Sequence, residues 1–96
     1  MHSKEIINIL KEQKNNLIQK YQIDTIGVFG SHARDTAGPQ SDIDIVVKLK
    51  KQDLFDLIGI KQDLEDKFHT HVDLVSYRNT MDPYLKKKID QEAIYV

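Results

Sequence analysis

The chain has 96 residues, a formal net charge of −1 at pH 7 and no cysteine. This length suits one domain, residues 1–96, with a modest core, and leaves no room for a second domain. The near-neutral charge argues against a general attraction to nucleic acid or acidic membranes, and the absence of cysteine excludes disulfides, thiol catalysis and cysteine-based metal sites.

The first element expected is an amphipathic helix over residues 4–20, with Ser3 as its N-cap. Its lysines could contact a partner, but a solvated helix face is the simpler interpretation. A short apolar run at residues 26–29 then predicts a buried strand bounded by a turn.

Gly30 and Ser31 form that turn. Ser31 can cap a short helix over residues 32–35, whose free N–H groups and positive dipole end would suit an anion. Gly38-Pro39 keeps the helix short. The turn is therefore a candidate phosphate site, which His32 could also approach.

The next strand, residues 41–47, carries two acids one residue apart. Because side chains alternate along a strand, Asp42 and Asp44 share one face while Ile43 and Ile45 face the core. Two carboxylates this close repel each other unless a cation lies between them, and oxygen ligands favour Mg²⁺ or Mn²⁺ over zinc. If the turn and the acids serve one ligand, the two strands run antiparallel.

A third acid, Asp73, lies in another short apolar strand. The connection to it is a helix capped by Asp53, and a strand–helix–strand unit gives parallel neighbours. Asp73 should then lie beside Asp42 and Asp44, and three carboxylates beside an anion turn describe a metal–nucleotide site for in-line displacement at phosphorus. The apolar side chains of the connecting helix expected to face the core are Leu54, Leu57, Ile58, Leu64 and Phe68.

The pair Asp82-Pro83 predicts the start of a last helix that ends near Glu92. The basic run at residues 86–88 is interpreted as an exposed face. Residues 94–96 form an apolar tail that could dock on the sheet edge or contact another chain. The inward residues of this helix are expected to be Tyr84, Leu85 and Ile89.

Gly30-Ser31, ten intervening residues, Asp42-Ile43-Asp44 and later Val72-Asp73-Leu74 resemble the nucleotidyltransferase superfamily related to polymerase β. More narrowly, the chain is similar to the minimal nucleotidyltransferases (MNT domains) that pair with HEPN proteins in bacterial and archaeal toxin–antitoxin systems. The resemblance covers nearly the whole chain. The fold expected is α/β, the nucleotidyltransferase fold, with a small three-stranded mixed sheet and about four helices in the order α-β-α-β-α-β-α.

The resemblance also implies a role for each matching residue. Mg²⁺ would be the cofactor, with two ions expected and Mn²⁺ as an alternative, and ATP would be the substrate. Many members have a glycine after the arginine, where this chain has Asp35. By resemblance, the nucleotide-binding residues would be Gly30, Ser31, Arg34 and Ser41, and the catalytic and metal-binding residues would be Asp42, Asp44 and Asp73, the last helping to deprotonate the acceptor hydroxyl.

The function implied is that of an antitoxin enzyme that transfers AMP from ATP to a tyrosine hydroxyl of a HEPN RNase toxin. One alternative is a weak or inactive MNT domain that neutralises the toxin by binding, which Asp35 beside the phosphates would favour. Another, less favoured, is an enzyme acting on a small molecule or an RNA end. No signal peptide or transmembrane run is visible, so we expect a cytoplasmic protein that binds neither membranes nor nucleic acid directly.

Overall fold

The computed structural model describes residues 2–34, 36, 38 and 42–96. The elements in these residues are α1 (Ser3–Lys20), β1 (Ile23–Phe29), α2 (Gly30–Ala33), β2 (Ile43–Leu49), α3 (Leu54–Phe68), β3 (Val72–Ser76), α4 (Pro83–Glu92) and β4 (Ile94–Tyr95). The predicted α/β order is confirmed, with one short strand added at the end. Within the described residues, no helix is long and apolar enough to cross a membrane.

The sheet is mixed and has the strand order β3-β2-β1-β4. β1 and β2 are antiparallel, and β2 and β3 are parallel, as the sequence predicts. The register pairs Asp44 of β2 with Phe29 at the end of β1 and with Asp73 of β3. The turn after β1 and the three acids therefore lie at one end of the sheet.

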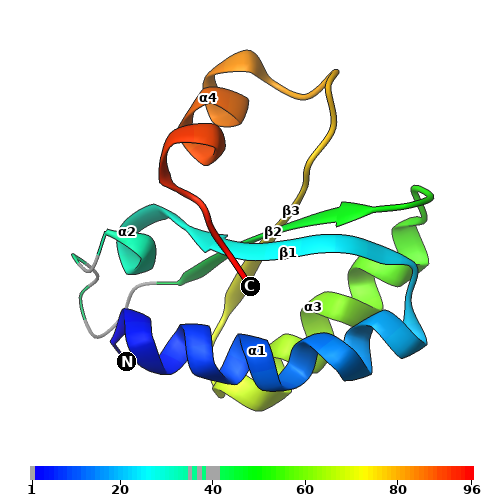
Figure 1. Ribbon diagram of the computed structural model, residues 1–96, viewed down its shortest axis with the longest axis horizontal. Helices are drawn as coiled ribbons and strands as arrows, with labels where there is room; N and C mark the ends of the chain where they lie inside the picture. Colours follow the sequence, from blue (N-terminus) through cyan, green and yellow to red (C-terminus); the bar gives the residue numbers. More distant parts are fainter. Residues whose placement is uncertain (1, 35, 37, 39–41) are drawn as a thin grey trace.

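The sheet separates two helical layers (Figure 1). Helices α1 and α3 cover one face, over a large core that includes Ile43 and Ile45 of β2. Helix α4 covers the other face, where Ile89 packs with Phe29 and Val46. Because Asp44 and Val46 are two residues apart on β2, Asp44 points to the same side as α4.

The expectation of only three strands is wrong, because the apolar tail docks on the free edge of β1 as β4. β4 pairs antiparallel with β1, Gly27 opposite Tyr95. A Cβ on Gly27 would lie 2.7 Å from the carbonyl oxygen of Ile94, so a glycine is needed for this close approach. The tail is held further by Val96, whose N–H donates to the Ile26 carbonyl at 3.1 Å and whose carbonyl accepts from Lys14 Nζ at 2.7 Å.

Two of the predicted helix caps are confirmed. Asp53 accepts hydrogen bonds from the N–H of Phe55 at 2.9 Å and of Asp56 at 3.3 Å, and Asp82 accepts from that of Leu85 at 2.9 Å. The prediction for Ser3 is wrong, because His2 is the N-cap of α1. The Ser3 hydroxyl instead donates to the carbonyl of His32, which joins the first turn of α1 to α2.

Three apolar residues expected to face the core are exposed, namely Leu54 (69%), Ile58 (54%) and Tyr84 (82%). The buried residues of α3 are Ile60, Leu64 and Phe68, all beyond its first turn. Helical spacing shows which residues share a face, but not how far the neighbouring layer extends along the helix. Near its N-terminal end, α3 therefore leaves Leu54 and Ile58 uncovered, while Leu57 packs partly buried against the core.

Candidate functional site

The turn after β1 lies directly against Asp44. Gly30 has φ +73°, a left-handed conformation that favours glycine. A Cβ on Gly30 would overlap Oδ2 of Asp44, so any side chain here would collide with the carboxylate. The structure thus brings together the two parts of the site that the sequence predicts, and the backbone of Gly30 is in contact distance of an acid.

Asp44 is the least exposed of the three acids. It is half-buried, whereas Asp42 and Asp73 are exposed. Burial raises its pKa, and the negative charge of Asp73, its register neighbour on β3, raises it further. The charge of Asp42 acts in the same direction, while the ammonium of Lys88 on α4 lowers the pKa. Asp44 therefore lies in a field of negative charge that Lys88 offsets only in part.

Carboxylate oxygens are the donors that Mg²⁺ and Mn²⁺ prefer, so the donor set and its unbalanced charge suit such an ion. The three acids do not, however, converge on one point. Across residues 2–34, 36, 38 and 42–96, no three His, Cys, Asp or Glu side chains are grouped closely enough to hold a metal ion. The assembled part of the site is the pair Asp44 and Asp73, with Asp42 exposed directly before β2.

The other predicted nucleotide-binding residues, Ser31, Arg34 and Ser41, differ in how the structure describes them. Ser31 is the second residue of α2 and not its cap, because Phe29 is the N-cap and gives no side-chain hydrogen bond. Arg34 ends α2 and is ion-paired with Glu92 of α4, Nη1 to Oε1, at 2.8 Å. Ser41 lies outside the described residues, as does Asp35.

The sequence analysis suggested that His32 could approach the phosphates, and the structure places it as a buried residue of α2. It is only 4% exposed, and burial lowers its pKa, as does the positive N-terminus. Its ring is hydrogen-bonded to the backbone of Asp42, while its Nδ1 atom is buried with no partner among the described residues. His32 thus connects the turn to the first acid of β2, a positioning contact that no local sequence pattern reveals.

A second feature that the sequence analysis missed is a hollow of about 510 Å³ beside α4. Lys88 is one of its lining residues and is also the cation that acts on Asp44. The lysine run at residues 86–88 was interpreted as a solvated face. The one available signal was the spacing of Tyr84 and Lys88, which places them one turn apart on one side of a helix.

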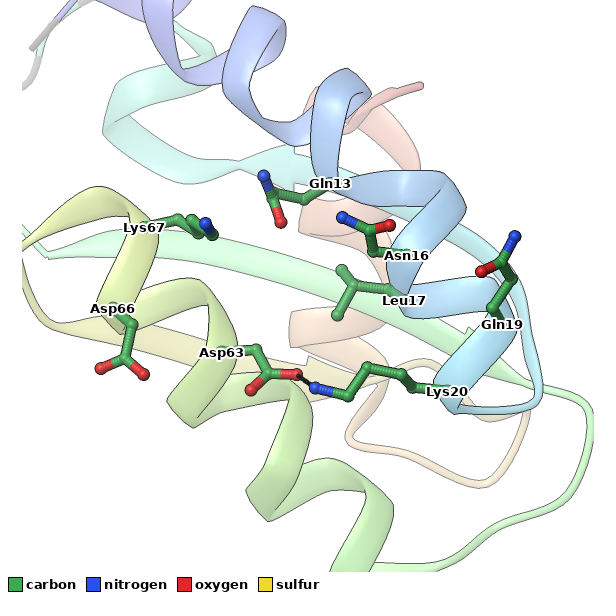
Figure 2. A pocket seen from close by; sticks show the side chains of 8 residues that line it. All are labelled: Gln13, Asn16, Leu17, Gln19, Lys20, Asp63, Asp66 and Lys67. Atoms are coloured by element: carbon green, nitrogen blue, oxygen red, sulfur yellow. Dashed lines mark hydrogen bonds and ion pairs between the residues drawn. The ribbon is translucent and has the colours of Figure 1, made fainter.

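A groove between α1 and α3 is a weaker candidate (Figure 2). It has a volume of about 500 Å³, and Lys20 crosses it to pair with Asp63 at 2.7 Å. Tyr21 also donates to Asp63, at 3.1 Å. The groove belongs to the helical layer on the opposite side of the sheet from α4, so the acids do not reach it.

Comparison with known protein families and relatives gives a consistent picture. Residues 4–96 match the family described as polymerase beta, nucleotidyltransferase. A relative from Methanocaldococcus jannaschii, provisionally named a protein adenylyltransferase, is 37% identical over 93 residues, which cover 96% of this chain and 95% of the relative. The protein adenylyltransferase MntA of Thermococcus cleftensis is 33% identical over 93 residues, covering 96% and 93%.

Solved structures show the same fold. One, of a protein provisionally assigned to the minimal nucleotidyltransferases, has a TM-score of 0.79 and 30% identity, and the match covers 98% of this chain and 95% of that one. Another is a complex of a tri-AMPylated HEPN toxin with an MNT antitoxin from Shewanella oneidensis. It has a TM-score of 0.62 and 23% identity, over 97% of this chain and 66% of that one. The second likeness concerns the fold alone.

Proposed function

The chain belongs to the polymerase β nucleotidyltransferase family, and from this membership we propose that it transfers AMP from ATP to a tyrosine hydroxyl of a HEPN RNase toxin, which it thereby neutralises. Relatives that match nearly their full length are named protein adenylyltransferases. A structural neighbour is described as an MNT antitoxin with a tri-AMPylated HEPN toxin. These names support the class of reaction and the class of partner.

The observation that carries the proposal is the contact between Gly30 and Asp44, with Asp73 opposite Asp44 in the sheet register. A phosphate chain lying on the turn would place its reacting phosphorus next to these carboxylates. Nucleotidyl transfer needs this arrangement because the protein contributes mainly positioning and charge stabilisation in such reactions.

We propose that Asp44 and Asp73, the assembled pair, would hold Mg²⁺ and that Asp42 would join them as a further ligand, with two ions expected and Mn²⁺ as an alternative. When bound, such an ion neutralises the charge that develops on the phosphate oxygens. Because the ion also removes the repulsion that raises the pKa of Asp44, its binding should become weaker as the pH falls and the carboxyl takes up a proton.

The chain's own residues then have distinct tasks. The turn at Gly30 and Ser31 orients the triphosphate, and Asp73, exposed at the start of β3, accepts the proton of the incoming hydroxyl. The tyrosine oxygen forms a bond to the α-phosphorus, the bond from that phosphorus to the bridging oxygen breaks, and pyrophosphate leaves. The proton passes from Asp73 to water.

Intact-mass spectrometry of a HEPN protein encoded beside this chain tests the proposal. After incubation with the chain, ATP and Mg²⁺, we expect added mass in whole AMP units on the HEPN protein. Asp42→Asn with Asp44→Asn should reduce the transfer rate at least about 100-fold, the upper range seen when residues that only orient metal ligands are changed. Asp66→Asn is the matched control, because it is the same acid-to-amide change at an exposed position of α3, and this variant should transfer AMP normally.

A stable complex in which the HEPN protein acquires no AMP would contradict the proposed enzymatic activity. It would favour the alternative in which the chain neutralises the toxin by binding alone. Full transfer by the double variant would show instead that the reaction takes place away from these acids. Peptide mapping of the modified HEPN protein should place the AMP on tyrosine, and a different acceptor would require that part of the proposal to be withdrawn.

A further inference from the structure

The hollow beside α4 is lined by residues from two elements that meet at the candidate site. Arg34, at the end of α2, faces α4 across it and pairs with Glu92 at 2.8 Å. This ion pair fixes α4 relative to the turn at Gly30. The full lining is Arg34, Tyr84, Lys87, Lys88, Gln91 and Glu92.

The hollow is lined by two lysines, Lys87 and Lys88, besides the paired Arg34 and Glu92. Lys87 and Lys88 make no ion pair within the described part of the chain, whereas Lys86 is 3.6 Å from Asp90 and lies 5.6 Å from the ring centroid of Tyr77. Because Lys87 and Lys88 follow Tyr84 by three and four residues, the three side chains share one side of α4. Two free ammonium groups beside one aromatic ring match a ligand with an anionic end and a flat end.

Tyr84 supports the same ligand class. Its side chain is 82% exposed, although an aromatic ring is normally buried or stacked. A nucleobase stacks readily on such a ring, whichever base it is. The volume of about 510 Å³ falls within the range of small-molecule sites.

The hollow approaches the acids through Lys88, which lines it and whose ammonium attracts the Asp44 carboxylate. A phosphate chain that began at the Gly30 turn could therefore continue past Asp44 and meet a cation. An acceptor protein could also use a cationic surface, but the exposed ring of Tyr84 beside two ammonium groups favours a nucleotide.

We propose that this hollow is the nucleotide pocket, in which Lys88 and Lys87 contact the triphosphate and Tyr84 stacks on the base. The assignment rests on the proposed function, because it names the residues that hold its ATP. It adds substrate contacts on α4, an element that carries none of Asp42, Asp44 and Asp73. Arg34 acts here as a positioning residue, through Glu92 and α4.

Calorimetric titration with ATP and Mg²⁺, without any acceptor, tests the pocket. Lys88→Gln should weaken ATP binding about tenfold, the loss expected for one charge-assisted hydrogen bond, and Lys88→Arg should restore most of it. Lys86→Gln is the matched control on the same helix, because its ammonium contacts Tyr77 and Asp90, and it should bind ATP as the wild type does.

Titration with inorganic tripolyphosphate separates the two contacts. Lys88→Gln should weaken both ATP and tripolyphosphate, whereas Tyr84→Ala should weaken ATP about tenfold and leave tripolyphosphate unchanged, with Tyr84→Phe close to wild type. Melting temperatures measured on each variant show whether it is folded. A loss of tripolyphosphate binding in Tyr84→Ala would contradict the assigned stacking role.

Failure of this inference can be told from failure of the proposed function. If the wild type transfers AMP while Lys88→Gln binds ATP normally, the pocket is elsewhere and only this inference is overturned. If Lys88→Gln raises the KM for the HEPN protein without changing ATP affinity, the hollow receives the acceptor and the inference is again overturned. If the wild type binds no ATP, both the pocket assignment and the proposed function are overturned.

Discussion

Asp44, on β2, is the residue at which the turn at Gly30, β3 and α4 meet. Its carboxylate lies against Gly30, has Asp73 beside it in the register and is attracted by Lys88. Burial and the neighbouring carboxylates raise its pKa in the folded chain. Its charge is therefore destabilising in the absence of a metal, which is the usual condition of a group kept for function.

Asp44→Asn should stabilise the metal-free protein at pH 7. A carboxyl whose folded pKa is raised contributes stability below its unfolded pKa, and this contribution is lost as the pH rises through the folded value. The asparagine amide does not ionise, so the variant avoids the stability that the wild type loses when Asp44 becomes charged. It should therefore melt at a higher temperature than the wild type at pH 7. The advantage should disappear at about pH 3, below the ordinary aspartate pKa.

Thermal denaturation at both pH values, with chelator present, measures this effect. Asp66→Asn on exposed α3 controls for the general effect of removing one negative charge. If Asp44→Asn melted below the wild type at pH 7, the repulsion inferred from the structure would be absent.

Gly30→Ala should destabilise the fold by about 1–3 kcal/mol and abolish transfer, because a left-handed backbone and a collision with Asp44 Oδ2 both oppose a side chain. Urea denaturation gives the first quantity and the AMP-transfer assay the second. Adding Asp44→Ala to this variant should recover part of the stability, since only the backbone strain would remain. Strictly additive effects of the two changes would argue against the contact.

At the scale of the elements, β4 shows how a short tail becomes part of the sheet. Gly27→Val should displace it, because a Cβ at this position lies 2.7 Å from the Ile94 carbonyl oxygen. We expect a loss of about 1–3 kcal/mol, typical of overpacking, and faster hydrogen exchange of the Val96 amide, which now donates to Ile26. Unchanged protection of that amide would mean that the tail tolerates a side chain and that the glycine serves another purpose.

The elements could largely be predicted from the sequence, because the apolar runs of β1, β2 and β3 are short and bounded by clear turn signals. The caps Asp53 and Asp82 were equally clear, since each makes its hydrogen bonds within its own first turn. The errors at Ser3 and Ser31 are errors of helix boundary, because Ser3 is the first residue of α1 and Ser31 is the second residue of α2. A serine before a helix can cap it or bond elsewhere, and for Ser3 the choice depends on a residue 29 positions away.

The site itself was predictable only in part. Asp42, Asp44 and Asp73 follow from strand alternation and from the parallel crossover, which are local and topological rules. The approach of Lys88 depends on α4 lying over the same face as Asp44, and no pattern within α4 encodes that placement. The burial of His32 depends likewise on how α2 sits on β2.

For the whole molecule, the central feature is that the sheet's connections bring one turn and three acids to the same end. The antiparallel step from β1 to β2 places Gly30 on Asp44, and the parallel crossover through α3 adds Asp73. Helices α1 and α3 fill the opposite face, so the acids are left on the side that α4 covers only partly.

The most direct test is an NMR measurement of paramagnetic broadening by Mn²⁺ in the presence of a non-hydrolysable ATP analogue. The account predicts that the amide signals of Gly30, Asp44 and Asp73 broaden first, and that Asp44→Asn with Asp42→Asn abolishes the effect. Broadening centred on Asp63 and Asp66, in the groove between α1 and α3, would contradict it and move the metal–nucleotide site to the other face of the sheet.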